Sequence, residues 1–238
     1  MQTKPMKIMV YSHDAYGLGN IRRMLAICEH LLQTLPDLSI LLLSGSPMLQ
    51  SFRLPQGLDY IKLPGLHRST DGVLSNKYLG LDVETTHRLR SELMLAAARN
   101  FQPDLLLVDK KPYGLRCELQ STVRYLKCTQ PHTRFVLLLR DILDSPERVI
   151  QEWESHHYYS AVDLIYDQVL VVGMREVYDL CMAYQFPVNV ADKVKFCGYV
   201  RKPTGAIDRS TIRENLGLGP ADRLVLVTPA GAKMAIHS

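Results

Sequence analysis

Residues Met6 to Leu35 read M-K-I-M-V-Y-S-H-D-A-Y-G-L-G-N-I-R-R-M-L-A-I-C-E-H-L-L-Q-T-L and combine three local patterns. Ile8 to Tyr11 is a short apolar run, long enough for one buried strand. Ser12 to Gly19 is polar and rich in glycine, and apolar residues then recur at helical spacing from Ile21 to Leu35. Strand, turn and helix in this order predict the first half of a βαβ unit. The turn of such a unit lies at the carboxyl end of its strand, where open α/β sheets bind ligands.

The turn after this strand has the composition of an anion site. Gly17 and Gly19 would let the backbone approach a ligand closely, and the helix start offers unpaired N–H groups and a partial positive charge. Asn20, Arg22 and Arg23 follow, and arginine suits bidentate contacts to phosphate or carboxylate. Arg22 stands where G-x-G-x-x-G needs its third glycine, and no lysine with serine or threonine follows, which excludes a Walker-type loop. Alternatively, the glycines only form the turn and the arginines are solvated.

The alternation of apolar runs and helical patterns continues along the chain. Further strands are predicted at Leu38–Leu43, Tyr60–Leu63, Leu105–Val108, Phe135–Leu139, Val169–Val172 and Val194–Phe196. Helices are predicted at Val83–Phe101, at Leu115–Leu126 and from Pro146 onward. Leu66 to Leu81 is expected to be a polar loop over the sheet edge that carries the glycine turn. Together these elements predict an α/β fold with a Rossmann-like, doubly wound parallel sheet.

A second domain is predicted near the end of the chain. Residues 1–199 are interpreted as one domain, and residues 200–238 as a linker and the start of a second α/β domain. Arg209–Leu216 is expected to be a helix and Leu224–Val227 a strand. Because a strand so close to the last residue cannot bury itself, the second domain is interpreted as truncated.

Composition and charge narrow the class of protein. The 238 residues carry a net charge of only +4, and the basic residues are scattered, unlike the dense basic face of nucleic-acid binders. The chain shows neither a signal core nor a run of about 18 apolar residues, so a cytoplasmic protein is predicted, with peripheral contact at the inner membrane face left open. Five cysteines without C-x-x-C or zinc spacing are interpreted as reduced core thiols.

Polar residues follow several predicted strands and would share one edge of a parallel sheet. They are the pair His13 and Asp14, then Ser44, the pair Asp109 and Lys110, and the pair Arg140 and Asp141. His13, oriented by Asp14, is the predicted catalytic base because histidine titrates near neutral pH, and Asp109 is the other catalytic candidate. Lys110, Arg140 and Asp141 are predicted to bind substrate.

Each of the three pairs also has a structural interpretation. His13 and Asp14 could hydrogen-bond the turn, and Asp109 and Lys110 could be a solvated loop pair. Arg140 and Asp141 could be a structural ion pair. His156 to Tyr159, H-H-Y-Y, has the composition of a metal or sugar-stacking cluster, but adjacent helical histidines point in different directions, so no metal site is predicted. Trp153 is expected in the core at its helical spacing.

Four stretches of the chain carry a family resemblance. They are Y-S-H-D-A-Y-G-L-G-N-I-R-R at Tyr11–Arg23, L-L-L-R-D-I-L-D at Leu137–Asp144, Y-D-Q-V-L-V-V-G at Tyr166–Gly173 and F-C-G-Y-V-R-K-P at Phe196–Pro203. They resemble predicted bacterial glycosyltransferases with the two-domain GT-B fold, distantly similar to the lipid-linked N-acetylglucosamine transferase of peptidoglycan synthesis. The resemblance implies an acceptor-binding N-terminal domain, a second domain for a nucleotide-sugar donor, and hexosyl transfer to a sugar, lipid or small-molecule acceptor without a metal or other cofactor.

The chain departs from this family in two places. Relatives often carry the candidate base, a histidine, where this chain has Asn20, and asparagine cannot take a proton at neutral pH, so the base would be His13 or Asp109. Relatives also continue after the Leu224 strand with a glycine-rich loop and a whole donor domain, of which Thr228–Gly231 is a remnant. The chain alone is therefore expected to be inactive or incomplete.

Other classes of function stay open at this point. A sugar-nucleotide epimerase or hydrolase of the same fold would need an acid/base pair between its two domains. A non-catalytic fragment that only binds a partner is favoured by Asn20 and by the missing donor domain. An NAD-dependent enzyme is disfavoured by Arg22 and by the lack of an acidic residue after the second strand.

Overall fold

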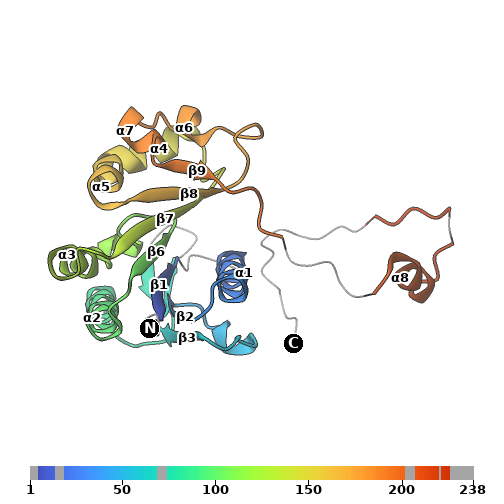
Figure 1. The fold of residues 1–238 in the computed structure, drawn as a ribbon, viewed down its shortest axis with the longest axis horizontal. Helices are drawn as coiled ribbons and strands as arrows, with labels where there is room; N and C mark the ends of the chain where they lie inside the picture. Colours follow the sequence, from blue (N-terminus) through green and yellow to red (C-terminus); the bar gives the residue numbers. More distant parts are fainter. Residues whose placement is uncertain (1–4, 14–18, 69–73, 202–206, 220, 226–238) are drawn as a thin grey trace. The chain divides into compact units, whose positions relative to one another are not determined.

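The computed structural model describes residues 5–13, 19–68, 74–201, 207–219 and 221–225. The chain divides into two compact units, Met1–Val200 and Arg201–Ser238, which are described separately. The first unit is a parallel sheet covered by helices, and the described part of the second contains one short helix (Figure 1).

The large sheet of the first unit has seven parallel strands in the order β3-β2-β1-β6-β7-β8-β9 (Figure 1). Their bounds are β1 Met6–Ser12, β2 Leu38–Ser44, β3 Leu58–Lys62, β6 Leu105–Asp109, β7 Arg134–Arg140, β8 Gln168–Val172 and β9 Val194–Phe196. Ile8 of β1 pairs with Ile40 on one side and with Leu105 on the other. The chain builds the sheet outward from β1 in both directions, so the topological switch point lies between β1 and β6. The predicted doubly wound sheet is confirmed.

Helices cover both faces of this sheet because successive strand residues point to opposite sides (Figure 1). Ile8 and Val10 of β1 pack in the cluster of buried residues that contains α1 (Gly19–Thr34). Met9 and Tyr11 belong to the cluster on the other face. That cluster includes buried residues of α2 (Val83–Phe101), α3 (Gln120–Thr129), α4 (Pro146–Ser155), α5 (Tyr158–Ile165), α6 (Leu180–Ala183) and α7 (Val188–Ala191). Burial on both faces explains why the strands read as continuous apolar runs rather than as alternating ones.

Two predicted elements of the first unit are wrong in detail. The expected loop Leu66–Leu81 contains an antiparallel pair, β4 (Leu66–Arg68) and β5 (Leu74–Asn76). The expected helix Leu115–Leu126 is divided into a 3-10 turn, η2 (Leu115–Cys117), and α3. The division follows from the backbone, because φ is +49° at Arg116 and +63° at Cys117, which an α-helix does not tolerate.

The single tryptophan and the cysteines test the predicted core. Trp153 is 2% exposed and packs against Phe186 with ring centroids 4.9 Å apart, as predicted. Cys28 is buried, but Cys128 and Cys197 are exposed, so the interpretation of all five as core thiols is wrong. No helix within the described ranges has the length and apolar character needed to span a membrane.

The second unit is described only in part. Its helix α8 (Arg209–Asn215) confirms the predicted helix to within one residue. Leu224 and Val225 are not in a strand, and residues 226–227 of the predicted strand lie outside the described residues, as does the expected remnant loop Thr228–Gly231. None of the described residues of this unit is buried.

Candidate functional site

The candidate site begins where β1 and β6 end side by side at the switch point. Tyr11 pairs with Val108, so Ser12 at the end of β1, His13 directly after it and Asp109 at the end of β6 share the carboxyl edge of the sheet. Asp109 is fully buried, and His13 is 3% exposed. An open α/β sheet binds ligands in the crevice outside these two strand ends.

The carboxylate of Asp109 links both strands to α1. Its Oδ1 accepts a hydrogen bond from Nη2 of Arg23 at 2.7 Å, and its Oδ2 accepts one from the backbone N–H of His13 at 3.3 Å. Burial raises the pKa of Asp109 above its ordinary value, while the Arg23 guanidinium and the His13 N–H oppose that rise. Asp109 thus joins the end of β6 to α1 and to the backbone of His13.

Asn20 contacts the backbone of His13 at its carbonyl group. Its side-chain Nδ2 donates to the backbone carbonyl of His13 at 2.8 Å. Asn20 and Arg23 are three residues apart in the first turn of α1, so both reach the same end of β1. The backbone of His13 is therefore fixed at its N–H and at its C=O. The imidazole ring lies edge-on to Tyr11, with centroids 6.4 Å apart.

The structure describes only some of the other residues that were predicted for the glycine turn and the helix start. Asp14 and Gly17 lie outside the described residues. Gly19 is exposed at the start of α1, and a Cβ there would meet nothing within 4 Å, so packing does not require glycine at this position. Arg22 is exposed and forms no hydrogen bond or ion pair of its side chain within the described ranges.

A cavity of about 190 Å³ lies at the carboxyl ends of β6 and β7 and against α4. It is lined by Lys110, Lys111, Leu143, Asp144, Val149, Glu152 and Trp153. The ammonium group of Lys111 forms an ion pair with the carboxylate of Glu152. Burial lowers the pKa of Lys110, and the nearby cations Lys111 and Arg140 lower it further. The predicted residue Lys110 thus belongs to a cavity whose other polar residues the sequence did not indicate.

Arg140 and Asp141 do not form the ion pair proposed as their structural interpretation. Arg140 is exposed and has no ion-pair partner among the described residues. Asp141 instead accepts hydrogen bonds from the Tyr199 hydroxyl at 2.9 Å and from the Ile142 N–H at 2.8 Å. Asp141 therefore connects the end of β7 to the segment that follows β9.

The predicted cluster His156–Tyr159 lies where α4 ends and α5 begins, and its first histidine contacts only nearby residues. Nδ1 of His156 lies 2.9 Å from the carbonyl oxygen of Glu152, and its ring stacks on Tyr158 at 5.2 Å. Over the part of the chain that the structure describes, no group of three or more His, Cys, Asp or Glu side chains could hold a metal ion. The predicted metal-independent chemistry stays a prediction.

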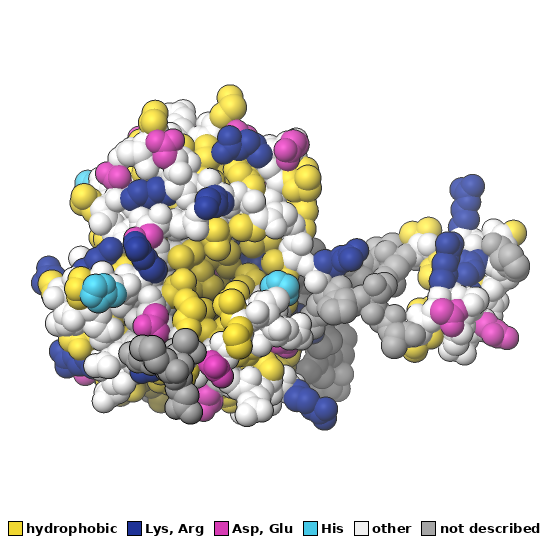
Figure 2. Space-filling view, in the orientation of Figure 1, with side chains coloured by type: hydrophobic (Ala, Val, Ile, Leu, Met, Phe, Trp, Pro, Cys, Tyr) yellow, Lys and Arg dark blue, Asp and Glu magenta, His cyan; other side chains and the backbone are white. Residues whose placement is uncertain are grey.

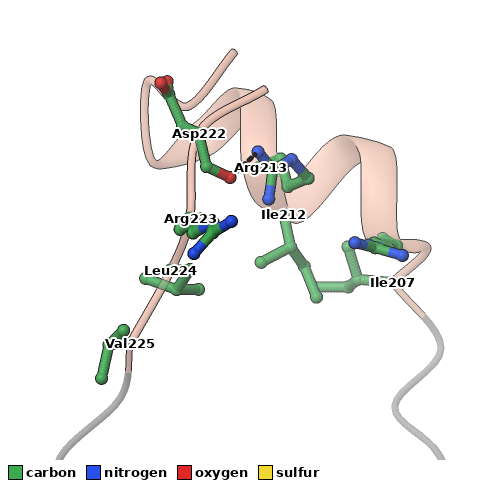
Figure 3. A pocket seen from close by; sticks show the side chains of 8 residues that line it. Ile207, Ile212, Arg213, Asp222, Arg223, Leu224 and Val225 are labelled. Atoms are coloured by element: carbon green, nitrogen blue, oxygen red, sulfur yellow. Dashed lines mark hydrogen bonds between the residues drawn. The ribbon is translucent and has the colours of Figure 1, made fainter. Parts of the chain in front are cut away.

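Two further hollows are lined largely by apolar side chains, unlike the polar site at the switch point (Figure 2 and Figure 3). Figure 2 shows apolar side chains gathered in a hollow of the first unit, with Lys and Arg side chains at its margin. In the second unit, Ile207, Ile212 and Leu224 converge on one side of α8 and line an open hollow of about 790 Å³ (Figure 3). Nη2 of Arg213 donates to the backbone oxygen of Asp222 at 2.8 Å beside it (Figure 3).

Comparison with known proteins supports the fold. No protein-family model and no curated protein matches the chain. A UGT transferase from Siraitia grosvenorii, solved in complex with UDP, matches with a TM-score of 0.50 at 13% identity, over 88% of this chain and 54% of that one. HepE from Anabaena, solved in complex with UDP-glucose, matches with a TM-score of 0.50 at 15% identity, over 89% and 50%.

The comparisons therefore define a class of fold. The chain spans about half the length of these two structures, which belong to the GT-B glycosyltransferase class. MurG from Acinetobacter baumannii matches with a TM-score of 0.35, which is too low to support an argument. The protein has an α/β Rossmann-like fold, with structural neighbours in the GT-B glycosyltransferase class.

Proposed function

We propose that this chain is the acceptor-side half of a GT-B glycosyltransferase that moves a hexosyl group from a nucleotide-sugar donor to a sugar, lipid or small-molecule acceptor. The observation that carries the proposal is the assembly of His13, Arg23 and Asp109 at the switch point between β1 and β6. The fold supports it, since two solved structures of similar fold contain UDP or UDP-glucose, and this chain covers only 54% and 50% of them.

In the proposed reaction His13 is the general base. Its neutral imidazole takes the proton of the acceptor hydroxyl while the hydroxyl oxygen attacks the anomeric carbon of the donor. The new glycosidic bond forms as the bond from that carbon to the diphosphate breaks, and the nucleoside diphosphate leaves with the electron pair. Asp14 is the predicted partner that orients the imidazole.

Asp109 and Asn20 are positioning residues in this proposal. Asp109 is fully buried and paired with Arg23, so it is better suited to hold the His13 backbone than to take a proton itself. Asn20 replaces the histidine that the family resemblance would place there and holds the His13 carbonyl. Both observations are consistent with a general base at His13, after β1, in place of a histidine at position 20, at the start of α1.

The proposal is tested with the longest polypeptide that the reading frame encodes. We expect nucleoside diphosphate release from one of a panel of UDP-, GDP- and dTDP-sugars, and His13→Ala lowers it at least about a hundredfold, the scale of a lost general base. His30→Ala, an exposed histidine on α1, is the matched control and leaves the rate unchanged.

Other results would contradict the proposal in distinct ways. Equal rates for wild type and His13→Ala would remove His13 from the mechanism. Interconversion of the donor sugar without an acceptor would indicate an epimerase. No turnover of any donor by a correctly folded polypeptide would favour a binding module.

A further inference from the structure

Lys110 has an unusual backbone for a lysine. Its φ is +73°, and the N–H of Lys111 donates to the carbonyl of Asp109 at 2.9 Å, which closes a three-residue γ-turn around Lys110. Its own N–H still donates to Leu138 at 2.9 Å, in continuation of the β6–β7 pairing. Glycine adopts such a backbone without strain, whereas lysine does not.

Helix ends do not explain this backbone. Gln102 also has a positive φ, but it caps the end of α2, where left-handed residues are common. Lys110 instead follows a central strand directly, at the switch point of the sheet. Strained residues persist where the surrounding structure holds them and are concentrated at functional sites.

Among the described residues, the ammonium group of Lys110 has no ion-pair partner of its own. Asp109 is committed to Arg23 and to the His13 N–H, and Glu152 is committed to Lys111. Lys110 itself forms no side-chain hydrogen bond or ion pair with any residue in the described ranges, although it is half-buried. The cations Lys111 and Arg140 act on it more strongly than the carboxylates of Glu152 and Asp109.

The cavity that Lys110 lines has the size of one small group. Its volume of about 190 Å³ corresponds to roughly six water molecules at ~30 Å³ each. That is below the ~300 Å³ at which pockets for drug-sized ligands begin. A whole nucleotide sugar is too large for it, whereas a single sugar ring or a charged substituent is not.

We propose that this cavity is a subsite for an oxyanion, a phosphate or carboxylate group carried by the acceptor, and that Lys110 is the cation that binds it. Lys110 is the next residue along the chain from Asp109, so a group bound here lies beside the candidate catalytic site. The identification of the ligand as an acceptor rests on the proposed glycosyltransferase function, but anion binding at Lys110 does not.

Equilibrium binding to the 238-residue chain tests the inference without any turnover. Glucose 6-phosphate and glucuronate serve as the phosphate and carboxylate probes, glucose as the uncharged probe, and inorganic phosphate as the bare oxyanion, each titrated calorimetrically. We expect at least one anionic sugar to bind, glucose to bind at least tenfold more weakly, and Lys110→Met to weaken the anion at least tenfold, because a charge-assisted hydrogen bond is lost.

Two further variants make the result specific. Lys110→Gly removes the ammonium but suits the γ-turn, so it should stay folded, with a thermal midpoint no lower than that of the wild type, and lose the anion equally. Lys195→Met removes an exposed lysine on β9 and should change nothing. The inference is overturned if no probe binds, if glucose binds as well as its charged forms, or if Lys110→Gly and Lys195→Met bind alike. Inorganic phosphate binding as tightly as glucose 6-phosphate would assign the site to free phosphate rather than to an acceptor.

Discussion

Two of the most deeply buried charges in the described chain lie outside the candidate site. Nε and Nη2 of Arg90 on α2 donate to the two carboxylate oxygens of Glu118 at 2.6 and 2.7 Å. The Tyr11 hydroxyl of β1 donates to Oε1 of Glu118 at 2.7 Å, and Nη1 of Arg90 donates to the carbonyl of Pro64 at 2.6 Å. This network joins α2 and the segment after β6 to Tyr11 of β1, the strand that precedes His13.

Glu118→Gln should destabilise the protein strongly. The amide keeps the size of the side chain but removes the carboxylate that pairs with the buried guanidinium of Arg90, and breaking a buried ion pair in this way costs about 3–5 kcal/mol. The free energy of unfolding from urea titration measures the loss.

Replacing both charges provides the control. Arg90→Met with Glu118→Leu should cost less than Glu118→Gln alone, because both members of the buried Arg90–Glu118 pair are removed together. A loss below about 1 kcal/mol for Glu118→Gln, the usual scale of an exposed pair, would show that the network does not stabilise the fold.

Individual residues divide into those that sequence could indicate and those that it could not. His13, Arg23 and Asp109 were candidates because each lies at a strand end or at a helix start. Their mutual contacts were not predictable, because Arg23 and Asp109 are 86 residues apart and meet only in the finished sheet. Glu118 gave no local signal at all, since a glutamate within a predicted helix normally faces solvent.

At the scale of elements, the ends of β7 and β8 and the segment after β9 meet in a tight contact. Gly173 and Gly198 exchange two backbone hydrogen bonds of 3.0 Å, beside the Asp141–Tyr199 hydrogen bond. A Cβ at Gly173 would lie 2.5 Å from Cβ and 2.9 Å from Cγ of Asp141. The glycine is required by space, and the contact sets where the chain leaves the sheet.

Gly173→Ala should therefore destabilise the first unit by about 1–3 kcal/mol, the range for overpacking a well-packed site. Gly80→Ala, whose Cβ would meet nothing within 4 Å, is the matched control and should stay within about 0.5 kcal/mol of wild type. Both are read from the midpoint of urea unfolding.

A double variant tests the cause of that loss. Adding Asp141→Gly to Gly173→Ala should recover part of the stability, so the two effects are not additive. Additive losses would show that the clash with Asp141 is not the reason for the glycine.

Helices and strands were predictable where their burial leaves a recognisable apolar pattern in the sequence. The seven strands of the large sheet were predicted to within two residues at each end, because strands buried on both faces leave continuous apolar runs. The β4–β5 pair was missed because each strand has three residues and a largely polar sequence. The separation of η2 from α3 was not predicted because Arg116 and Cys117 have a left-handed backbone although neither is glycine, the residue that would indicate such a backbone in a sequence.

At the scale of the whole molecule, burial is confined to the first unit among the described residues. Every buried side chain lies in Met1–Val200, and the described residues after Val200 include α8 but no strand and no buried residue. The assignment of residues 200–238 to a second α/β domain therefore stays a prediction. The family resemblance predicts such a domain, but apolar side chains such as Leu224 are not packed in a core among the described residues.

This distribution predicts that a polypeptide ending at Val200 unfolds like the whole chain. Its thermal midpoint should agree to within about 2 °C, since the described residues after Val200 include no buried side chain and their removal should cost less than about 0.5 kcal/mol. The urea m-value should also be unchanged, because m follows the surface exposed on unfolding. Circular dichroism at matched concentration measures both quantities for the two polypeptides.

The complementary peptide, residues 201–238, completes the experiment. We expect no cooperative thermal transition from it, because chains below about 40 residues rarely bury enough apolar surface to fold without a staple or a partner. A cooperative transition of the peptide, or a lower midpoint for the shorter polypeptide, would show that the last residues contribute to stability. The candidate site at the β1–β6 switch point would then have to be studied with them present, since its rigidity would no longer depend on the first unit alone.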